Sequence, residues 1–302
     1  METPHHLGID IGGTKVALRV ETDAGCVCET AFPWGPRHSA EQDLAQLAGH
    51  VAELRARLEA PPVSVGVAMP GTVGPDGRVA AWPNRPEWTG LDLAASLRAL
   101  FPEAVVAWGD DGDLGALAEA RASGCADLLY LGVGTGVGGG LVLGGLPCPG
   151  LGRGSFEIGH VIVEMGGARC VCGRQGCLQA LASGPATLRR AARLRGADVT
   201  FDDLRRAWCD EQPWAIDAIE GTARALATAV IGVQELVHPE LALIGGGFAA
   251  GIPEFVGAVA GHLAGLARPG QTPVPVGAAK LGGLSSLRGA VSLARLIAGR
   301  RD

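Results

Sequence analysis

Two segments, one near the start of each half of the chain, share a layout that constrains the fold more than any other feature. Residues 7–20, LGIDIGGTKVALRV, are two short β-rich runs joined by Gly-Gly-Thr, and the arrangement returns from Leu128 with a longer glycine turn. Such runs around a glycine turn predict a β-hairpin whose turn approaches a ligand closely. Two hairpins at corresponding places predict a duplicated nucleotide-binding fold.

The remaining segments alternate between strand and helix patterns. Over 40–60, apolar residues recur at spacings of three and four, which predicts an amphipathic helix. Strands that alternate with helices indicate an α/β fold, and we expect one lobe over 1–118 and a larger one over 119–284. The other expected elements are strands at 63–69, 105–108 and the start of 241–251, a helix near 92–100, a helix-rich stretch over 180–237 and a final helix at 285–298.

Composition excludes two classes of partner. Charged residues make up 19% of the chain and the formal net charge is −6, so no basic field exists to hold nucleic acid or an anionic membrane. The uncharged segment 128–152 is too rich in glycine for a membrane-spanning helix. The first residues lack the pattern of a secretory signal, so we expect a cytoplasmic protein. We assign the 48 glycines partly to ligand-binding turns and otherwise to codon composition.

The first glycine turn is a candidate phosphate site. In Asp10-Ile-Gly-Gly-Thr-Lys15, the absence of a Cβ at Gly12 and Gly13 lets backbone N–H groups face an anion, with Lys15 close by. Thr14 adds a hydroxyl donor, and Asp10 is suited to holding Mg²⁺ through water. A tight hairpin turn with incidental polar residues explains the same letters.

Two further glycine turns occur in the second half. The turn after the strand that starts at Leu128 again places small residues around a hydroxyl, and two such hairpins would clamp a polyphosphate from both sides; its residues are Gly134, Thr135 and Gly136. The strand that starts at 241 runs into a third turn, open enough for a base or ribose, made of Gly245, Gly246 and Gly247. Taken singly, each turn is equally explained as an ordinary hairpin or a junction between elements.

Three cysteines and one histidine have the spacing of a metal site. Cys170, Cys172 and Cys177 lie two and five residues apart, and His160 lies ten residues upstream. Together they supply a complete Cys₃His tetrahedron, and four protein ligands with no open position imply a structural zinc within a knuckle over 157–179. The metal-free alternative, three reduced cysteines on a loop, leaves the glycines between them without a purpose.

Three aspartates, Asp110, Asp111 and Asp113, follow the expected strand at 105–108. A carboxylate at the carboxyl end of a strand, between two phosphate turns, is placed to act as a general base on a hydroxyl. The structural alternative is an N-cap for the helix expected over 114–121, and one of the three is expected to serve as that cap.

The order of these motifs resembles that of the ROK family, which takes in bacterial glucokinases, other sugar kinases and sugar-responsive repressors. The resemblance covers nearly the whole chain and rests on DIGGTK, the Pro70-Gly71 turn, Asn84 ahead of Pro86 and Trp88, the Asp111 region, GTGVGGG, EIGH with CxCGxxGC, and IGGG. It implies the actin-like, hexokinase-type ribonuclease H-like duplication, with a substrate cleft between two lobes.

The resemblance also implies an ATP-dependent hexose 6-kinase that uses Mg²⁺, and it assigns roles by position. Asp111 matches the catalytic base that takes the proton from the 6-hydroxyl of the sugar. The positions that contact the sugar are matched by Gly71, Asn84, Asp110, Asp111, Glu157, His160 and Gln179. Family members are commonly homodimers or tetramers, and their last helix, here about 285–302, packs on the first lobe.

Two positions depart from the family pattern, with Asp110 in place of an asparagine and Gln179 in place of a glutamate. Near-isosteric drift is one explanation. The sharper hypothesis is that Asp110 meets an ammonium at position 3 of a 3-amino-3-deoxyglucose such as kanosamine; plain glucose is the other candidate substrate. The alternative function is a non-catalytic sugar-binding or regulatory member of the family, and polyphosphate stays open as a donor beside ATP.

Overall fold

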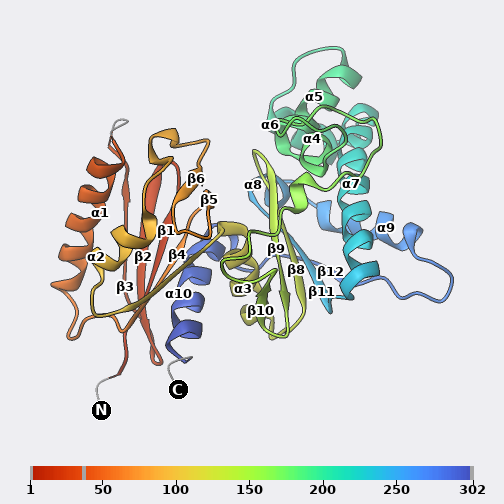
Figure 1. Ribbon diagram of the computed structural model, residues 1–302. Helices are drawn as coiled ribbons and strands as arrows, with labels where there is room; N and C mark the ends of the chain where they lie inside the picture. The colour runs from red at the N-terminus through yellow and green to blue at the C-terminus, as the bar shows by residue number, and fades with distance from the viewer. Residues whose placement is uncertain (1–2, 36–38, 300–302) are drawn as a thin grey trace. The chain divides into compact units, whose positions relative to one another are not determined.

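The computed structural model describes residues 3–35 and 39–299 and forms two compact units. The first unit comprises Met1–Ala118, Pro147–Ser155 and Leu284–Asp302, and the second comprises Glu119–Leu146 and Phe156–Gly283. Each contains a mixed five-stranded sheet (Figure 1).

The sheet of the first unit is built on the first predicted hairpin. Its strands lie in the order β3-β2-β1-β4-β7; β1 pairs antiparallel with β2 and parallel with β4, and β4 pairs parallel with β7. The strands are β1 (His6–Ile11), β2 (Lys15–Thr22), β3 (Gly25–Pro33), β4 (Ser64–Ala68) and β7 (Val105–Gly109), with a separate small hairpin of β5 (Thr72–Val73) and β6 (Val79–Ala81).

The sheet of the second unit repeats this topology. Its order is β10-β9-β8-β11-β12. As in the first sheet, β8 pairs antiparallel with its hairpin partner β9 and parallel with β11, and β11 pairs parallel with β12. The strands are β8 (Leu128–Val133), β9 (Val137–Leu143), β10 (Leu146–Cys148), β11 (Leu241–Gly245) and β12 (Val276–Ala278). The predicted duplication is therefore confirmed at the level of sheet topology.

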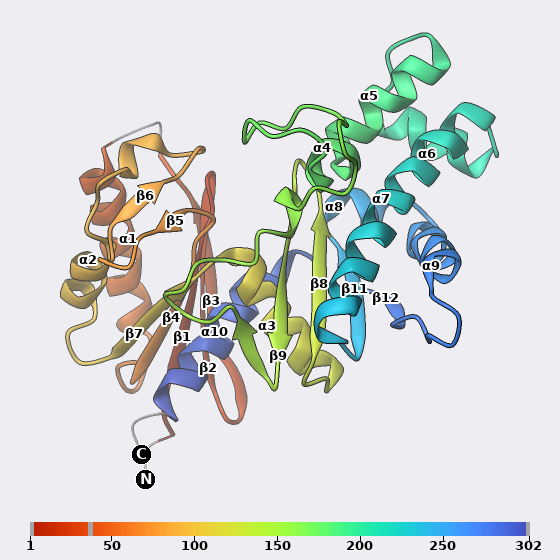
Figure 2. The ribbon, with the colours of Figure 1, turned by 45° about the vertical axis from the view of Figure 1, so that its right-hand side comes forward.

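Helices cover both faces of the first sheet. Because side chains alternate along a strand, Leu7, Ile9 and Ile11 of β1 point to one face, and Gly8 points to the other. In the ribbon, α1 and α2 cover the first of these faces and α10 the second (Figures 1 and 2). The helices of this unit are α1 (Ala40–Arg55), α2 (Leu93–Leu100) and α10 (Ser285–Ala298), with α3 (Asp111–Ser123) beginning in it and a 3-10 turn, η1 (Pro86–Trp88).

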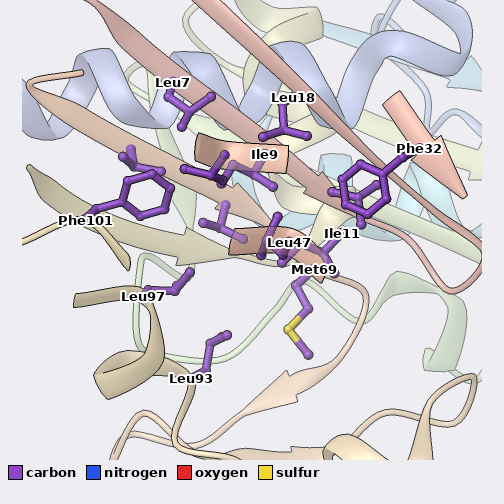
Figure 3. Packing of buried hydrophobic residues seen from close by; sticks show 14 of the residues in the cluster. Leu7, Ile9, Ile11, Leu18, Phe32, Leu47, Met69, Leu93, Leu97 and Phe101 are labelled. Atoms are coloured by element: carbon purple, nitrogen blue, oxygen red, sulfur yellow. The ribbon is translucent and has the colours of Figure 1, made fainter. Parts of the chain in front are cut away.

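The apolar core of the first unit lies between the sheet and the helices α1 and α2. Figure 3 shows Ile9 of β1 with Leu47 of α1 and Leu97 of α2, all of them buried. Each such side chain contributes about 1.5–3 kcal/mol on burial. Within α1, the buried apolar residues Leu47, Val51 and Leu54 keep the spacing of three and four that predicted this helix. A capping box between Ser39 and Gln42 fixes where α1 begins.

The expected helix over 40–60 ends five residues early, at Arg55. The N–H groups of Arg57 and Leu58 reach back only three residues, to Leu54 and Arg55, so the last turn tightens. Two prolines at 61–62 follow, and a proline disfavours helical geometry at the residue before it. The final helix matches its expected range of 285–298, and residues 300–302 of the longer range lie outside the described residues.

Among the helices of the second unit, α7 lies against α9, while α5 and α6 pack on α7 beyond the end of the sheet (Figure 2). They are α4 (Leu178–Ala182), α5 (Gly184–Arg195), α6 (Phe201–Cys209), α7 (Pro213–Val237), α8 (Gly247–Gly251) and α9 (Phe255–Leu266), with the 3-10 turns η2 (Ile158–His160) and η3 (Gly282–Leu284). No helix in the described ranges has the length and apolar character needed to cross a bilayer.

Candidate active site

The first glycine turn connects β1 to β2 and is held by side chains on one side. The carbonyl of Gly12 accepts a hydrogen bond from the Trp34 indole at 2.7 Å, and the carbonyl of Gly13 accepts one from Nε of Arg85 at 3.1 Å. The N–H of Gly12 donates to the carbonyl of Lys15 at 2.9 Å, which closes the turn. Two peptide carbonyls in the turn therefore face the interior of the first unit.

Asp10, near the end of β1, is a perturbed carboxyl group. Burial raises the pKa of Asp10, the Asp111 carboxylate raises it further and Lys15 lowers it, with a result of about 6. The three predicted residues Asp10, Lys15 and Asp111 thus interact electrostatically within one unit. A cation that binds beside Asp10 would stabilise the charged form of this carboxyl group.

Asp110 and Asp111 lie at the start of α3, directly after β7. The backbone carbonyl of Asp110 accepts from the N–H of Leu114 at 3.0 Å, and Oδ1 of Asp110 accepts from the N–H of Gly112 at 2.9 Å. Asp110 is therefore the helix cap, and α3 begins at Asp111 instead of at the expected residue 114. The N-cap of α3 is therefore Asp110 and not Asp111.

A cavity of about 360 Å³ in the first unit adjoins this helix start. Gly71, Asp110 and Asp113 line it together with Trp108 and residues of the glycine-rich segment 150–154. Two carboxylates and an aromatic ring in one cavity suit a ligand that carries hydroxyl or ammonium groups on an otherwise apolar face. The predicted sugar positions Gly71 and Asp110 are therefore brought to one cavity.

Asn84 lies beside the glycine turn and not in the lining of this cavity. A Cβ built on Gly13 would stand 3.0 Å from Cβ of Asn84 and 3.4 Å from its Nδ2. The structure thus places a predicted sugar residue against a predicted phosphate turn, and it explains why position 13 carries a glycine.

In the second unit, the turns at 134–136 and 245–247 are packed together. Gly134 donates its N–H to Gly136 at 2.9 Å, and its carbonyl accepts the N–H of Gly184, the first residue of α5, at 2.8 Å. Gly246 has a φ of 87° and lies so close to the backbone of Val133 that no side chain fits. Two of the three predicted nucleotide turns therefore lie next to each other within this unit, and Thr135 lies between Gly134 and Gly136.

The four predicted metal ligands converge. Single ligand atoms of His160, Cys170, Cys172 and Cys177 lie within 4.8 Å of one another. Nδ1 of His160 is 3.7 Å from Sγ of Cys170, and Sγ of Cys172 is 3.6 Å from Sγ of Cys177. A tetrahedron with zinc–sulfur bonds of about 2.3 Å has edges of about 3.8 Å, so this ligand set fits a zinc ion.

The thiols of the cluster titrate apart in the absence of a metal. Burial alone would raise the pKa of Cys170, but hydrogen bonds from the Cys172 backbone, from Gln179 and from His160 lower it to about 6. Burial and the hydrogen bond with Cys172 raise the pKa of Cys177 to about 11. A thiolate already favoured at Cys170 is the form that binds a metal ion.

Glu157 and His160 line one open cavity of the second unit, with Arg174 beside them. Gln179, the third predicted sugar residue of this unit, donates through Nε2 to Sγ of Cys170 at 3.5 Å and brings Oε1 to 3.1 Å from the position of a Cβ on Gly136. Gln179 therefore connects the metal cluster to a glycine turn, a contact that the sequence did not predict.

Sequence reasoning missed the side chains that hold the first turn. Trp34 and Arg85 are 7% and 4% exposed, and Arg85 pairs with the fully buried Asp43 of α1. The only local signal was an arginine flanked by Asn84 and Pro86, in a chain where arginine is abundant. Their partners are distant in sequence, so spacing carries no trace of them.

A duplicated mixed sheet with a glycine turn in each half and a carboxylate at a strand end is an arrangement suited to an α/β phosphotransferase. The family model described as "ROK family" matches residues 6–296. The chain belongs to the ROK family.

Relatives and solved structures agree with this membership. The chain is 74% identical over 298 residues, 99% of this chain and 98% of the relative, to the kanosamine kinase of Amycolatopsis mediterranei (strain S699). It is 29% identical over 264 residues to the glucokinase of Thermotoga maritima, covering 80% and 81% of the two chains. The ROK hexokinase of Thermus thermophilus matches with a TM-score of 0.89 and 29% identity over 98% of this chain and 99% of that one.

The protein is an ATP-dependent sugar kinase. The family, the hexokinase-type duplication and the enzyme class were all predicted from the sequence and are confirmed. The alternative of a non-catalytic or regulatory member finds no support among these relatives.

Proposed function

We propose that this enzyme transfers the γ-phosphate of ATP to the 6-hydroxyl of kanosamine, 3-amino-3-deoxyglucose. The observation that carries the proposal is the 74% identity to a kanosamine kinase over nearly the full length of both chains. Glucose is the competing substrate, because the glucokinase relative shares the family at 29% identity.

The chemistry of the first cavity supports an amino sugar. Asp110 caps α3, but asparagine caps helices as well as aspartate does, so the cap does not account for the negative charge. Asp113 faces the same cavity and adds a second carboxylate. An ammonium group bound by a carboxylate forms a charge-assisted hydrogen bond worth about 1.5–3 kcal/mol. Glucose offers only a neutral hydroxyl at that position.

Asp111 acts in this proposal as the general base. Its carboxylate takes the proton of the sugar 6-hydroxyl while the oxygen forms a bond to the γ-phosphorus, and the bond from that phosphorus to the bridging oxygen breaks to release ADP. The position of Asp111 in the first turn of α3 favours a negative side chain before the proton arrives.

The glycine turns bind the phosphates. Gly13 and Thr14 of the first unit supply N–H groups, Thr14 adds its hydroxyl and Lys15 its ammonium, and Gly12 closes the turn that presents them. Asp10 would hold Mg²⁺ through water. In the second unit the same task falls to Thr135 with its neighbouring glycines, while Gly245, Gly246 and Gly247 border the base or ribose. Bound Mg²⁺ neutralises charge on the β- and γ-phosphates.

The Cys₃His cluster holds a structural zinc in this proposal. The fit of its ligand spacing and the favoured thiolate at Cys170 support the assignment. Because His160 shares a cavity with Glu157, the metal would also fix the sugar-binding side of the second unit. We further propose that the enzyme acts as a homodimer, which light scattering of the purified protein tests.

The substrate assignment is tested by Asp110→Asn, which keeps the cap and removes the charge. A coupled assay of ADP release gives kcat/KM for kanosamine and for glucose with the wild type and the variant. We expect the ratio of kanosamine to glucose to fall by about tenfold or more in Asp110→Asn, because a charge-assisted hydrogen bond becomes a neutral one.

The matched control is Asp198→Asn, the same charge change at an exposed position of the second unit, where we expect no change in the ratio. Equal ratios in the wild type and Asp110→Asn would refute the role of Asp110 in recognising the amine.

A further inference from the structure

The peptide groups of the first glycine turn have their orientation set by two buried side-chain donors. Nε1 of Trp34 donates to the carbonyl of Gly12 at 2.7 Å, and Nε of Arg85 donates to the carbonyl of Gly13 at 3.1 Å. Indole and guanidinium N–H groups act as donors only, so neither bond can reverse its direction. The two carbonyls are therefore held towards Trp34 and Arg85.

The fixed carbonyls determine where the N–H groups point. In a trans peptide the C=O of one residue and the N–H of the next lie on opposite sides of the chain. A carbonyl of Gly12 that points to Trp34 turns the N–H of Gly13 away from it, and a carbonyl of Gly13 that points to Arg85 does the same for Thr14. Within the described part of the chain, neither of these N–H groups donates a hydrogen bond to the protein.

Arg85 is itself held by an ion pair and by an aromatic ring. Nη1 of Arg85 lies 2.5 Å from Oδ2 of Asp43, which is fully buried in α1 and also accepts from the Trp88 indole at 2.8 Å. The guanidinium stacks over the ring of Trp34, 4.7 Å from its centroid. The ion pair with Asp43 and the stacking on Trp34 fix the plane of the guanidinium group of Arg85. Its Nε–H therefore points in a defined direction, towards the carbonyl of Gly13.

The residue before Arg85 closes the other side of the turn. Asn84 occupies the space beside Gly13, with its Cβ 3.0 Å from where a Cβ of Gly13 would be. The turn is thus confined between the Asn84 side chain and the two donors.

We propose that Arg85 is a positioning residue for phosphoryl transfer, which orients the N–H groups of Gly13 and Thr14 towards the phosphates of ATP. Arg85 does so by holding the carbonyl of Gly13, and the buried Asp43 keeps its guanidinium in place. The inference rests on the proposed function in one respect, the assignment of this turn as a phosphate site.

The test is Arg85→Lys, which keeps a positive charge beside Asp43 but replaces the planar fork with one ammonium group. A single Nζ lacks the geometry to bind Asp43 and the Gly13 carbonyl together while stacking on Trp34. We expect the Kd of the magnesium complex of AMPPNP, measured by calorimetry, to rise about tenfold and the KM for ATP to rise in parallel. The Kd of the sugar without nucleotide should change less than about twofold.

A second variant removes one donor and keeps the ring. Trp34→Phe loses the indole N–H that holds Gly12, and we expect a smaller rise in the AMPPNP Kd than with Arg85→Lys. The control is Arg78→Lys, in an exposed ion pair with Asp92 of the same unit, for which we expect no change in nucleotide binding.

Thr14→Ala separates the two ways in which the inference can fail. A weaker Kd for AMPPNP in Thr14→Ala with an unchanged Kd in Arg85→Lys would overturn the role of Arg85 alone, even if Arg85→Lys had a lower melting temperature. Unchanged values in both variants would overturn the phosphate turn itself, and with it this part of the proposed function.

Discussion

At the residue scale, the ionised carboxylate of Asp10 lowers the free energy of unfolding of the protein. Asp10 is buried, stands near the Asp111 carboxylate and has a pKa of about 6 against an ordinary value of 3.8. Lys15 offsets only part of this cost. A divalent cation bound beside Asp10 would offset this cost, as the proposed role of Asp10 in holding Mg²⁺ requires.

The cost of Asp10 has a definite pH dependence. Between about pH 4 and 6 the folded protein binds more protons at Asp10 than the unfolded chain does, so its stability falls as the pH rises and stays lowered above pH 6. The difference between a pKa of about 6 and the ordinary value of 3.8 corresponds to about 3 kcal/mol.

We therefore expect Asp10→Asn to stabilise the apo protein, by up to about 3 kcal/mol at pH 7.5 and by about 1 kcal/mol less at pH 5. Urea unfolding at the two pH values, without nucleotide or magnesium, measures the difference. Asp198→Asn, an exposed control, should have no such pH-dependent gain. A gain that is the same at both pH values would show that the cost does not arise from titration of Asp10.

At the scale of an element, the knuckle over 157–179 shows what spacing in a sequence can and cannot predict. The four ligands converge as their spacing indicated, and Gly173 and Gly176 have φ values of 90° and 77°, which other residues rarely adopt. Ligand sets are predictable because coordination geometry dictates short, repeated intervals. The contact of Gln179 with Cys170 was not predictable, because it depends on how α4 packs against the knuckle.

We expect the structure of the knuckle to depend on a bound metal ion. Cys172→Ser removes an exposed ligand with little change in size, and we expect the zinc content of the purified enzyme to fall from about one per chain to near zero. The KM for the sugar should rise, because His160 and Glu157 line one cavity and lose their fixed support. Cys209→Ser, an exposed cysteine outside the cluster, is the control. Full zinc content in Cys172→Ser would contradict the assigned ligand set.

At the scale of the whole molecule, the sequence predicted the duplication because each half repeats a local pattern, a hairpin with a glycine turn. It did not predict the contacts that depend on residues far apart, of which the network of Asp43, Arg85 and Gly13 is the clearest case. Each of these three residues has an ordinary local explanation. Their joint role exists only once α1, η1 and the first hairpin are packed together.

Codon composition does not account for every glycine outside the binding turns. Gly8 and Gly66 are paired neighbours on β1 and β4 and lie directly under α10. A Cβ on Gly8 would reach 2.6 Å from Val291, and one on Gly66 would collide with the carbonyl of Ala290. These glycines let the last helix of the chain pack closely on the first strands.

Gly66→Ala tests this close packing between the two ends of the chain. The added methyl group meets backbone atoms of α10, which have no rotamer to change, so we expect a loss of about 1–3 kcal/mol in the free energy of unfolding. Gly49→Ala is the matched control, because Gly49 is exposed in α1 with no atom near its Cβ position, and alanine there should stabilise the helix by about 0.5–1 kcal/mol. Opposite signs in urea unfolding are the expected result. Equal stabilisation of both variants would mean that α10 does not press on β4, and that the glycine at 66 is there by composition alone.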